Sequence, residues 1–161
     1  MSSDTGDIIN GLRTIVQALR VSSRQAEKTA GLSGAQLFVL AQLATAETLS
    51  LNELAVRTHT HQSSVSVVVA KLVEEKLIDR ARSKSDARQL VLSLTAKGRK
   101  RLEQAPKTAQ DMLFEGLQKM APRERKTLAQ SLGKLIATSG MSNKEPQLFF
   151  EAASRKKIKK S

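Results

Sequence analysis

Apolar residues recur at intervals of three and four along most of the chain, which predicts a mainly helical protein. The first such stretch runs from about Asp7 to Thr29 and carries Ile8, Leu12, Ile15 and Leu19 on one face. Gly31 follows it as a C-terminal cap.

Two capping boxes predict where the next two helices begin. The runs Ser33-Gly34-Ala35-Gln36 and Ser50-Leu51-Asn52-Glu53 each place a hydroxyl three residues before a side chain that can reach back to the backbone. Leu51, Leu54 and Ala55 are expected to point inward from the second of these helices, which is short. A turn is expected at His59-Thr60.

The next helix is predicted from about His61 to Lys76. Val65, Val69 and Leu72 fall at spacings of four and three and form its inner face. The run of valines at 67–69 favours a strand by propensity, but the periodicity over three turns favours a helix.

A basic hairpin follows this helix, and further helices follow the hairpin. Leu90, Leu92 and Leu94 alternate with polar or smaller residues, as in a strand, and the loop Ser83–Ala87 is polar and expected to be flexible. Thr95 then caps a predicted long helix that runs to about Lys119 with a kink at Pro106. A last helix is expected from Pro122 to Gly140.

This order predicts a mostly α fold with a small β wing, a winged helix-turn-helix. Such a fold places its second helix in the DNA major groove, with the N-terminal residues at the base edges. The candidate recognition-helix contacts are Gln62, Ser63, Ser64, Ser66, Val67 and Lys71. Glutamine suits adenine, serine suits any base, valine suits the thymine methyl group and lysine suits a phosphate.

The candidate wing contacts are Arg80, Arg82, Lys84, Asp86 and Arg88. An arginine on a ribbon can enter a narrow minor groove. Asp86 lies two residues before Arg88 and is expected to orient its guanidinium through a salt bridge. The alternatives are a solvated first helical turn for the serines and a surface ion pair of little energetic value for Asp86 and Arg88.

The composition supports an anionic partner. The formal net charge is +12, and six basic residues against two acidic ones lie from Lys144 onward, in a tail expected to be flexible. There is no cysteine, so disulfides, thiolate metal sites and cysteine redox sensing are excluded. Neither a secretory signal nor an apolar run of roughly 20 residues is visible, so a cytoplasmic location without a membrane partner is expected.

An enzyme is disfavoured, because the sequence has no glycine-rich phosphate loop, no nucleophile motif and no well-spaced metal ligands. His59 and His61 are interpreted as polar turn residues rather than metal ligands, and no cofactor is expected. The basic tail leaves open a sequence-tolerant architectural DNA-binding protein as the alternative function.

Over about Asp7 to Thr138 the chain resembles the MarR family of bacterial winged-helix regulators. The matching segments are Leu32–Gln36, Leu54-Ala55, Gln62–Ser66, Leu77–Arg80, Asp86–Arg88 and Leu92–Gly98. Lys76 departs from the family pattern, which usually has glycine there, and Ala87 replaces a common basic residue.

The resemblance implies a homodimer that binds double-stranded DNA at a pseudo-palindromic site, in most members as a repressor and in many with release by a small-molecule effector. It assigns the wing arginine role to Arg88, with Asp86 as its partner. The implied regions are an N-terminal dimerisation helix (1–31), the winged helix-turn-helix (32–98), C-terminal dimerisation helices (99–140) and the basic tail (141–161).

Overall fold

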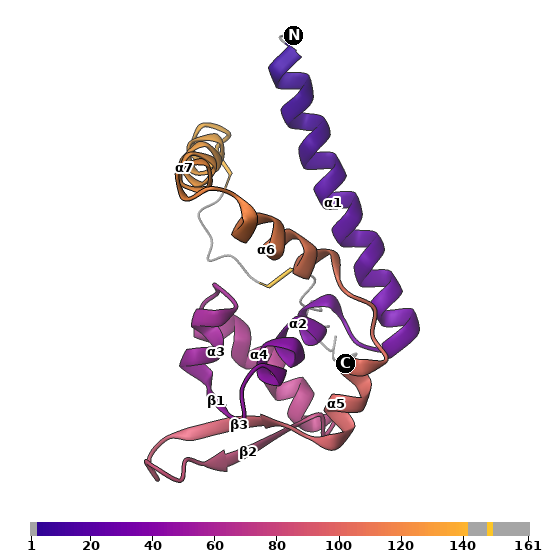
Figure 1. The fold of residues 1–161 in the computed structure, drawn as a ribbon, viewed down its shortest axis with the longest axis vertical. Helices are drawn as coiled ribbons and strands as arrows, with labels where there is room; N and C mark the ends of the chain where they lie inside the picture. Colours follow the sequence, from indigo (N-terminus) through magenta and orange to yellow (C-terminus); the bar gives the residue numbers. More distant parts are fainter. Residues whose placement is uncertain (1–2, 142–147, 150–161) are drawn as a thin grey trace, which may run out of the picture.

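The computed structural model describes residues 3–141 and 148–149, and these form a mainly helical structure with one small sheet. In chain order the elements are α1 (Ser3–Ala30), α2 (Gly34–Ala44), β1 (Leu49–Ser50), α3 (Leu51–Arg57), α4 (Gln62–Glu74), β2 (Ile78–Arg82), β3 (Leu90–Leu94), α5 (Ala96–Glu103), α6 (Ala109–Lys119) and α7 (Pro122–Thr138). Elements α2 to β3 form a compact head, from which the upper part of α1 projects into solvent (Figure 1).

The hydrophobic core lies in this head. Most of its largest fully buried side chains come from α2, α3, α4 and the start of β2, and include Phe38, Leu40, Leu54, Leu72 and Ile78. With no tryptophan or tyrosine in the chain, aliphatic side chains fill most of the core. α7, by contrast, buries no residue.

Both predicted capping boxes are confirmed. The Ser33 hydroxyl accepts from the Gln36 backbone N–H at 3.2 Å, and the Gln36 side-chain oxygen accepts from the Ser33 N–H at 2.9 Å. In the second box the Glu53 carboxylate accepts from the backbone N–H and hydroxyl of Ser50, each at 2.7 Å. These two hydrogen bonds, the backbone one first, lower the pKa of Glu53.

α3 and α4 are each followed, two residues after their last helical residue, by a non-glycine residue in the left-handed region. His59 has φ 52° and Lys76 has φ 60°. After α4, the Leu77 N–H donates to the Leu72 carbonyl at 2.8 Å and the Lys76 N–H to the Val73 carbonyl at 3.0 Å, a Schellman arrangement. α4 therefore ends at Glu74, two residues earlier than its predicted end.

The sheet has the strand order β1-β3-β2, with antiparallel pairing throughout. The two-residue strand β1 was not predicted. Arg80 pairs with Leu92 and Arg82 pairs with Leu90, so both arginines share the face of β3 on which Leu92 is buried. Leu90 is 56 % exposed, because the hairpin extends beyond the core towards its tip.

The prediction of one kinked helix from Thr95 to about Lys119 is wrong. The structure has two helices, α5 and α6, separated by residues 104–108. Pro106 cannot donate to a helical carbonyl, and Thr108 starts a new helix through a capping box with Asp111. The first helix also begins earlier than predicted, at Ser3.

No helix in the described ranges is long and apolar enough to cross a membrane. Most of the predicted flexible tail, 141–161, lies outside the described residues. Within it, Leu148 is only 4 % exposed and belongs to the core cluster, a packing that the sequence did not predict.

Candidate nucleic-acid interface

The N-terminal half of α4 presents a polar face to solvent. Gln62 and Ser63 are exposed in its first turn, Ser66 is half-buried, and the apolar side chain of Val67 is 38 % exposed. Val65, Val68, Val69 and Leu72 on the opposite side are buried against the head. The burial of these four side chains confirms the predicted inner face of α4, and it leaves the polar residues on the outer face of the helix.

Ser64 does not belong to this exposed face. Its side chain is 8 % exposed, because at position 64 the helix turns towards the core beside Val65. The structure therefore places Ser64 beside the core rather than among the exposed polar residues of α4, and a contact between Ser64 and DNA stays a prediction.

Two further predicted contact residues of α4, Ser66 and Lys71, are less free to reach DNA than the exposed first-turn residues. The Ser66 hydroxyl donates to the Ser63 carbonyl at 2.8 Å, which leaves its oxygen able to accept a hydrogen bond from outside. Lys71 is half-buried and lies two turns further along the helix from Ser63. Its place is therefore further from the base edges than that of the first-turn residues.

The wing carries four exposed cations and two exposed carboxylates, one of which is Asp79 on β2. Arg80 and Arg82 lie on β2, and Lys84, Asp86 and Arg88 lie in the loop between β2 and β3. The hairpin lies at the opposite end of the molecule from the N-terminus (Figure 1). A concentration of positive charge on an exposed ribbon attracts phosphates and suits a narrow minor groove.

Hydrogen bonds order the wing loop, which the sequence predicted to be flexible. The Arg82 guanidinium donates to the Ala87 carbonyl at 2.7 Å, and the Ser83 N–H donates to the Gln89 carbonyl at 2.8 Å. The Ser83 hydroxyl also accepts from the Asp86 N–H at 3.3 Å. Arg82 therefore holds the loop in shape, a role that its charge alone did not indicate.

Asp86 contacts the backbone of Arg88 and not its side chain. Its carboxylate accepts from the Arg88 N–H at 3.0 Å, and the structure records no ion pair between the two side chains, both of which are described. The expected orienting salt bridge is corrected: Asp86 forms an Asx turn that fixes the backbone from which Arg88 projects.

The two histidines have separate surroundings. The His59 ring stacks on Phe114 of α6 with centroids 5.7 Å apart, whereas His61 is the exposed N-cap residue of α4. Within the described ranges, no group of three histidine, cysteine, aspartate or glutamate side chains is arranged to hold a metal ion.

Comparison with known proteins matches residues 30–89 to the MarR family. The HTH-type transcriptional repressor MdtR of Bacillus subtilis is 27% identical over 139 residues, covering 86% of this chain and 90% of that protein. The HTH-type transcriptional regulator BilQ of Clostridium symbiosum is 30% identical over 107 residues, 65% of this chain and 74% of that protein.

A solved structure of Bordetella bronchiseptica BpsR, whose DNA binding is regulated by 6-hydroxynicotinic acid, superimposes with a TM-score of 0.55 at 25% identity. It covers 78% of this chain and 90% of that one. The structure of the head, the exposed face of α4 and the wing thus indicates the same family as the sequence comparisons. The chain belongs to the MarR family of winged-helix, DNA-binding transcriptional regulators, which are not enzymes.

Proposed function

We propose that this chain is a cytoplasmic repressor. It binds double-stranded DNA as a homodimer, at a pseudo-palindromic operator. The observation that carries the proposal is the exposed polar face of α4 in the same head as four exposed wing cations. One element then suits the major groove and the other the adjacent minor groove. The similarity to MdtR, which is named a repressor, supports repression rather than activation.

The first turns of α4 supply the proposed base contacts. Gln62 is suited to a bidentate contact with adenine, and Ser63 can donate or accept. Ser66 acts as an acceptor while its hydroxyl donates to Ser63, which favours the amino groups of adenine or cytosine. Val67 suits a thymine methyl group, and Lys71 contributes a phosphate contact.

The wing supplies affinity and a preference for A·T-rich flanks. Arg88 is the proposed minor-groove residue, because the Asp86 turn fixes its backbone and its side chain is exposed. Arg80, Arg82 and Lys84 are assigned to phosphates. Each cation that neutralises a phosphate releases counterions, so together they make binding strongly salt-dependent.

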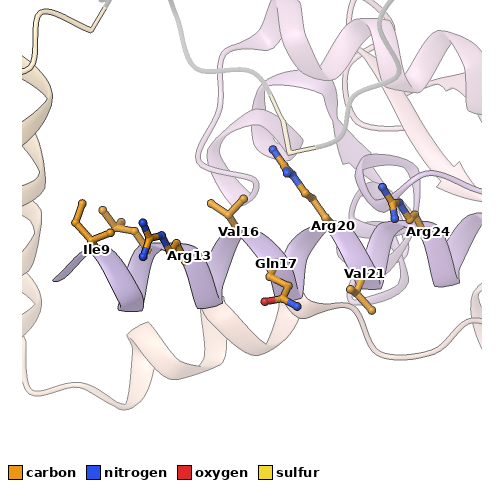
Figure 2. Close-up of a pocket in the computed structure, with 8 residues that line it drawn as sticks. Ile9, Arg13, Val16, Gln17, Arg20, Val21 and Arg24 are labelled. Carbon is orange, nitrogen blue, oxygen red and sulfur yellow. The ribbon is translucent and has the colours of Figure 1, made fainter. Parts of the chain in front are cut away.

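The apolar faces of α1 and α7 support the homodimer. α7 buries no residue, yet Leu128, Leu132, Leu135 and Ile136 recur along it with exposures of 36–42%. Ile9 and Val16 of α1 line an open groove of about 620 Å³ together with Arg13 and Arg20 (Figure 2). Such large exposed stripes favour association.

We therefore assign residues 1–31 and 99–140 to dimerisation and residues 32–98 to DNA binding. In a two-fold dimer the half-sites lie about 34 Å apart, one turn of DNA. Leu132→Asp is expected to yield monomers in sedimentation and to abolish cooperative binding to a two-half-site operator. Thr127→Asp, on the same helix, is the matched control.

Release by a small-molecule effector is the remaining part of the proposal. Its support is the likeness to BpsR, whose DNA binding responds to 6-hydroxynicotinic acid. Effector identity is best approached from the target genes.

The decisive experiment is selection of genomic fragments by the purified protein at about 150 mM salt, where electrostatic binding is screened. Enrichment of a palindromic site, lost in Gln62→Ala and weakened in Arg88→Ala, supports the repressor. Uniform recovery of all fragments would instead favour the architectural alternative, for which the basic residues of the tail are the specific observation.

A further inference from the structure

A short C-terminal segment packs against the body after the last helix. α7 ends at Thr138, yet Leu148 is buried to 4 % exposure in the core cluster and the adjacent Phe149 is 46 % exposed. We call these two residues the anchor. Burial of a leucine so far beyond the last helix shows that the chain returns to the head.

The anchor lies where the helix-turn-helix turn meets α6. A cavity of about 180 Å³ is lined by the anchor, by Thr58, His59 and Thr60 of the turn, and by Gln110 and Phe114 of α6. We call this contact the α6–turn junction. Phe114 of α6 stacks on His59 of the turn with ring centroids 5.7 Å apart, and its ring is tilted against Phe38 of α2 with centroids 5.0 Å apart.

The turn in this junction determines where α4 starts. Thr60 immediately precedes His61, the N-cap of α4, and His59 has the left-handed conformation that reverses the chain. A shift of the turn relative to α6 therefore moves the recognition helix relative to the helices that we assign to dimerisation.

The junction is filled incompletely. The Gln110 side-chain oxygen is buried without a hydrogen-bond partner, in a residue that is 4 % exposed. An unsatisfied buried acceptor costs free energy, and the leucine side chain offers it no donor. The anchor is thus held in the junction by apolar contact.

We propose that the α6–turn junction is a docking site for this chain's own anchor, which fixes the turn of the helix-turn-helix against α6. Leu148 fills the apolar part of the junction, and Phe149 covers its opening beside Phe114. The docking stands on the contacts of the anchor alone. Its effect on operator binding rests on the proposed function.

Cross-linking tests the docking directly, because the natural chain has no cysteine to interfere. The full-length double variant Thr60→Cys/Phe149→Cys is treated with a short bis-maleimide, and Thr60→Cys/Met141→Cys is the control. Rapid cross-linking at the mass of one chain, well above the control, supports the proposal. A product at the mass of two chains places the anchor on a second copy and overturns it, as does reaction no faster than the control.

Hydrogen exchange tests whether the anchor fixes the turn. Leu148→Asp places a charge in the junction, while Met141→Asp adds the same charge at an exposed position. We expect exchange in residues 55–62 to rise about tenfold only in Leu148→Asp. Leu148→Ala is expected to give a smaller rise in the same peptide. Equal exchange in the wild type and Leu148→Asp overturns the proposal.

Operator binding is measured on the same proteins. A looser turn lowers the fraction of binding-competent heads, so Leu148→Asp is expected to bind the selected operator several-fold more weakly than Met141→Asp. Affinity equal to that of the control overturns the link to DNA binding. If the wild-type protein selects no DNA at all, the proposed function fails while the cross-linking and exchange results still decide the docking.

Discussion

Replacing Lys76 with glycine is expected to stabilise the protein. Lys76 has φ 60° at the end of α4, a conformation that costs an L-residue about 1–2 kcal/mol. Glycine avoids this cost but loses about 0.4–1 kcal/mol through the greater freedom of the unfolded chain. The Lys76 side chain is exposed, so the net gain is about 0.5–1 kcal/mol.

Thermal unfolding of Lys76→Gly measures this gain. For a chain of this size, about 1 kcal/mol corresponds to about 2–4 °C, so we expect Tm to rise by about 1–4 °C. Lys76→Ala is the matched control, because it removes the same charge but keeps the left-handed cost, and its Tm should not rise. If Lys76→Gly is no more stable than Lys76→Ala, the left-handed backbone at Lys76 does not destabilise the fold.

Three further changes have defined outcomes. Gly98→Ala should lower the free energy of unfolding by about 1–3 kcal/mol in urea titrations, because the added Cβ would clash with the Leu77 carbonyl oxygen. An unchanged midpoint of unfolding would mean that α5 shifts without cost to make room for the Cβ. Lys84→Ala should weaken operator binding and reduce the slope of log K against log salt by about 0.9, as measured by fluorescence anisotropy, and an unaltered slope argues against a phosphate contact. Glu53→Gln should reduce stability at pH 7, because the lowered pKa of Glu53 stabilises the fold above its ordinary value of 4.5. The difference between Glu53→Gln and the wild type should shrink as the pH falls below 4.5 through the lowered pKa. Parallel stability–pH curves for the wild type and Glu53→Gln would show that the Ser50 hydrogen bonds do not favour the charged carboxylate.

Local signals in the sequence predicted most of the head. The capping residues Ser33 and Ser50 mark helix starts because a hydroxyl three residues before a glutamine or glutamate satisfies backbone donors wherever the helix later packs. A signal of the same kind, Thr108 followed three residues later by Asp111, lies after Pro106 and marks the start of α6.

Features that depend on tertiary packing were not predictable in this way. Ser64 lies at the border of the apolar face of α4, and only the packing of the head decides that it is buried. Asp86 had two donors within reach, and the loop geometry selects the Arg88 backbone over its guanidinium. Leu148 is buried in a core cluster whose other fully buried members lie between residues 26 and 92, and the sequence carries no periodic signal for so distant a packing.

The exposed apolar stripe of α7 makes the stability of this helix depend on protein concentration. α7 has 17 residues and no buried side chain, so it gains little of the tertiary packing that stabilises most protein helices. Its folding is then tied to association, so Tm should rise with protein concentration. With the proposed homodimer, the share of protein able to bind an operator then depends on how much protein the cell contains, so its expression level becomes an input to the genes it controls.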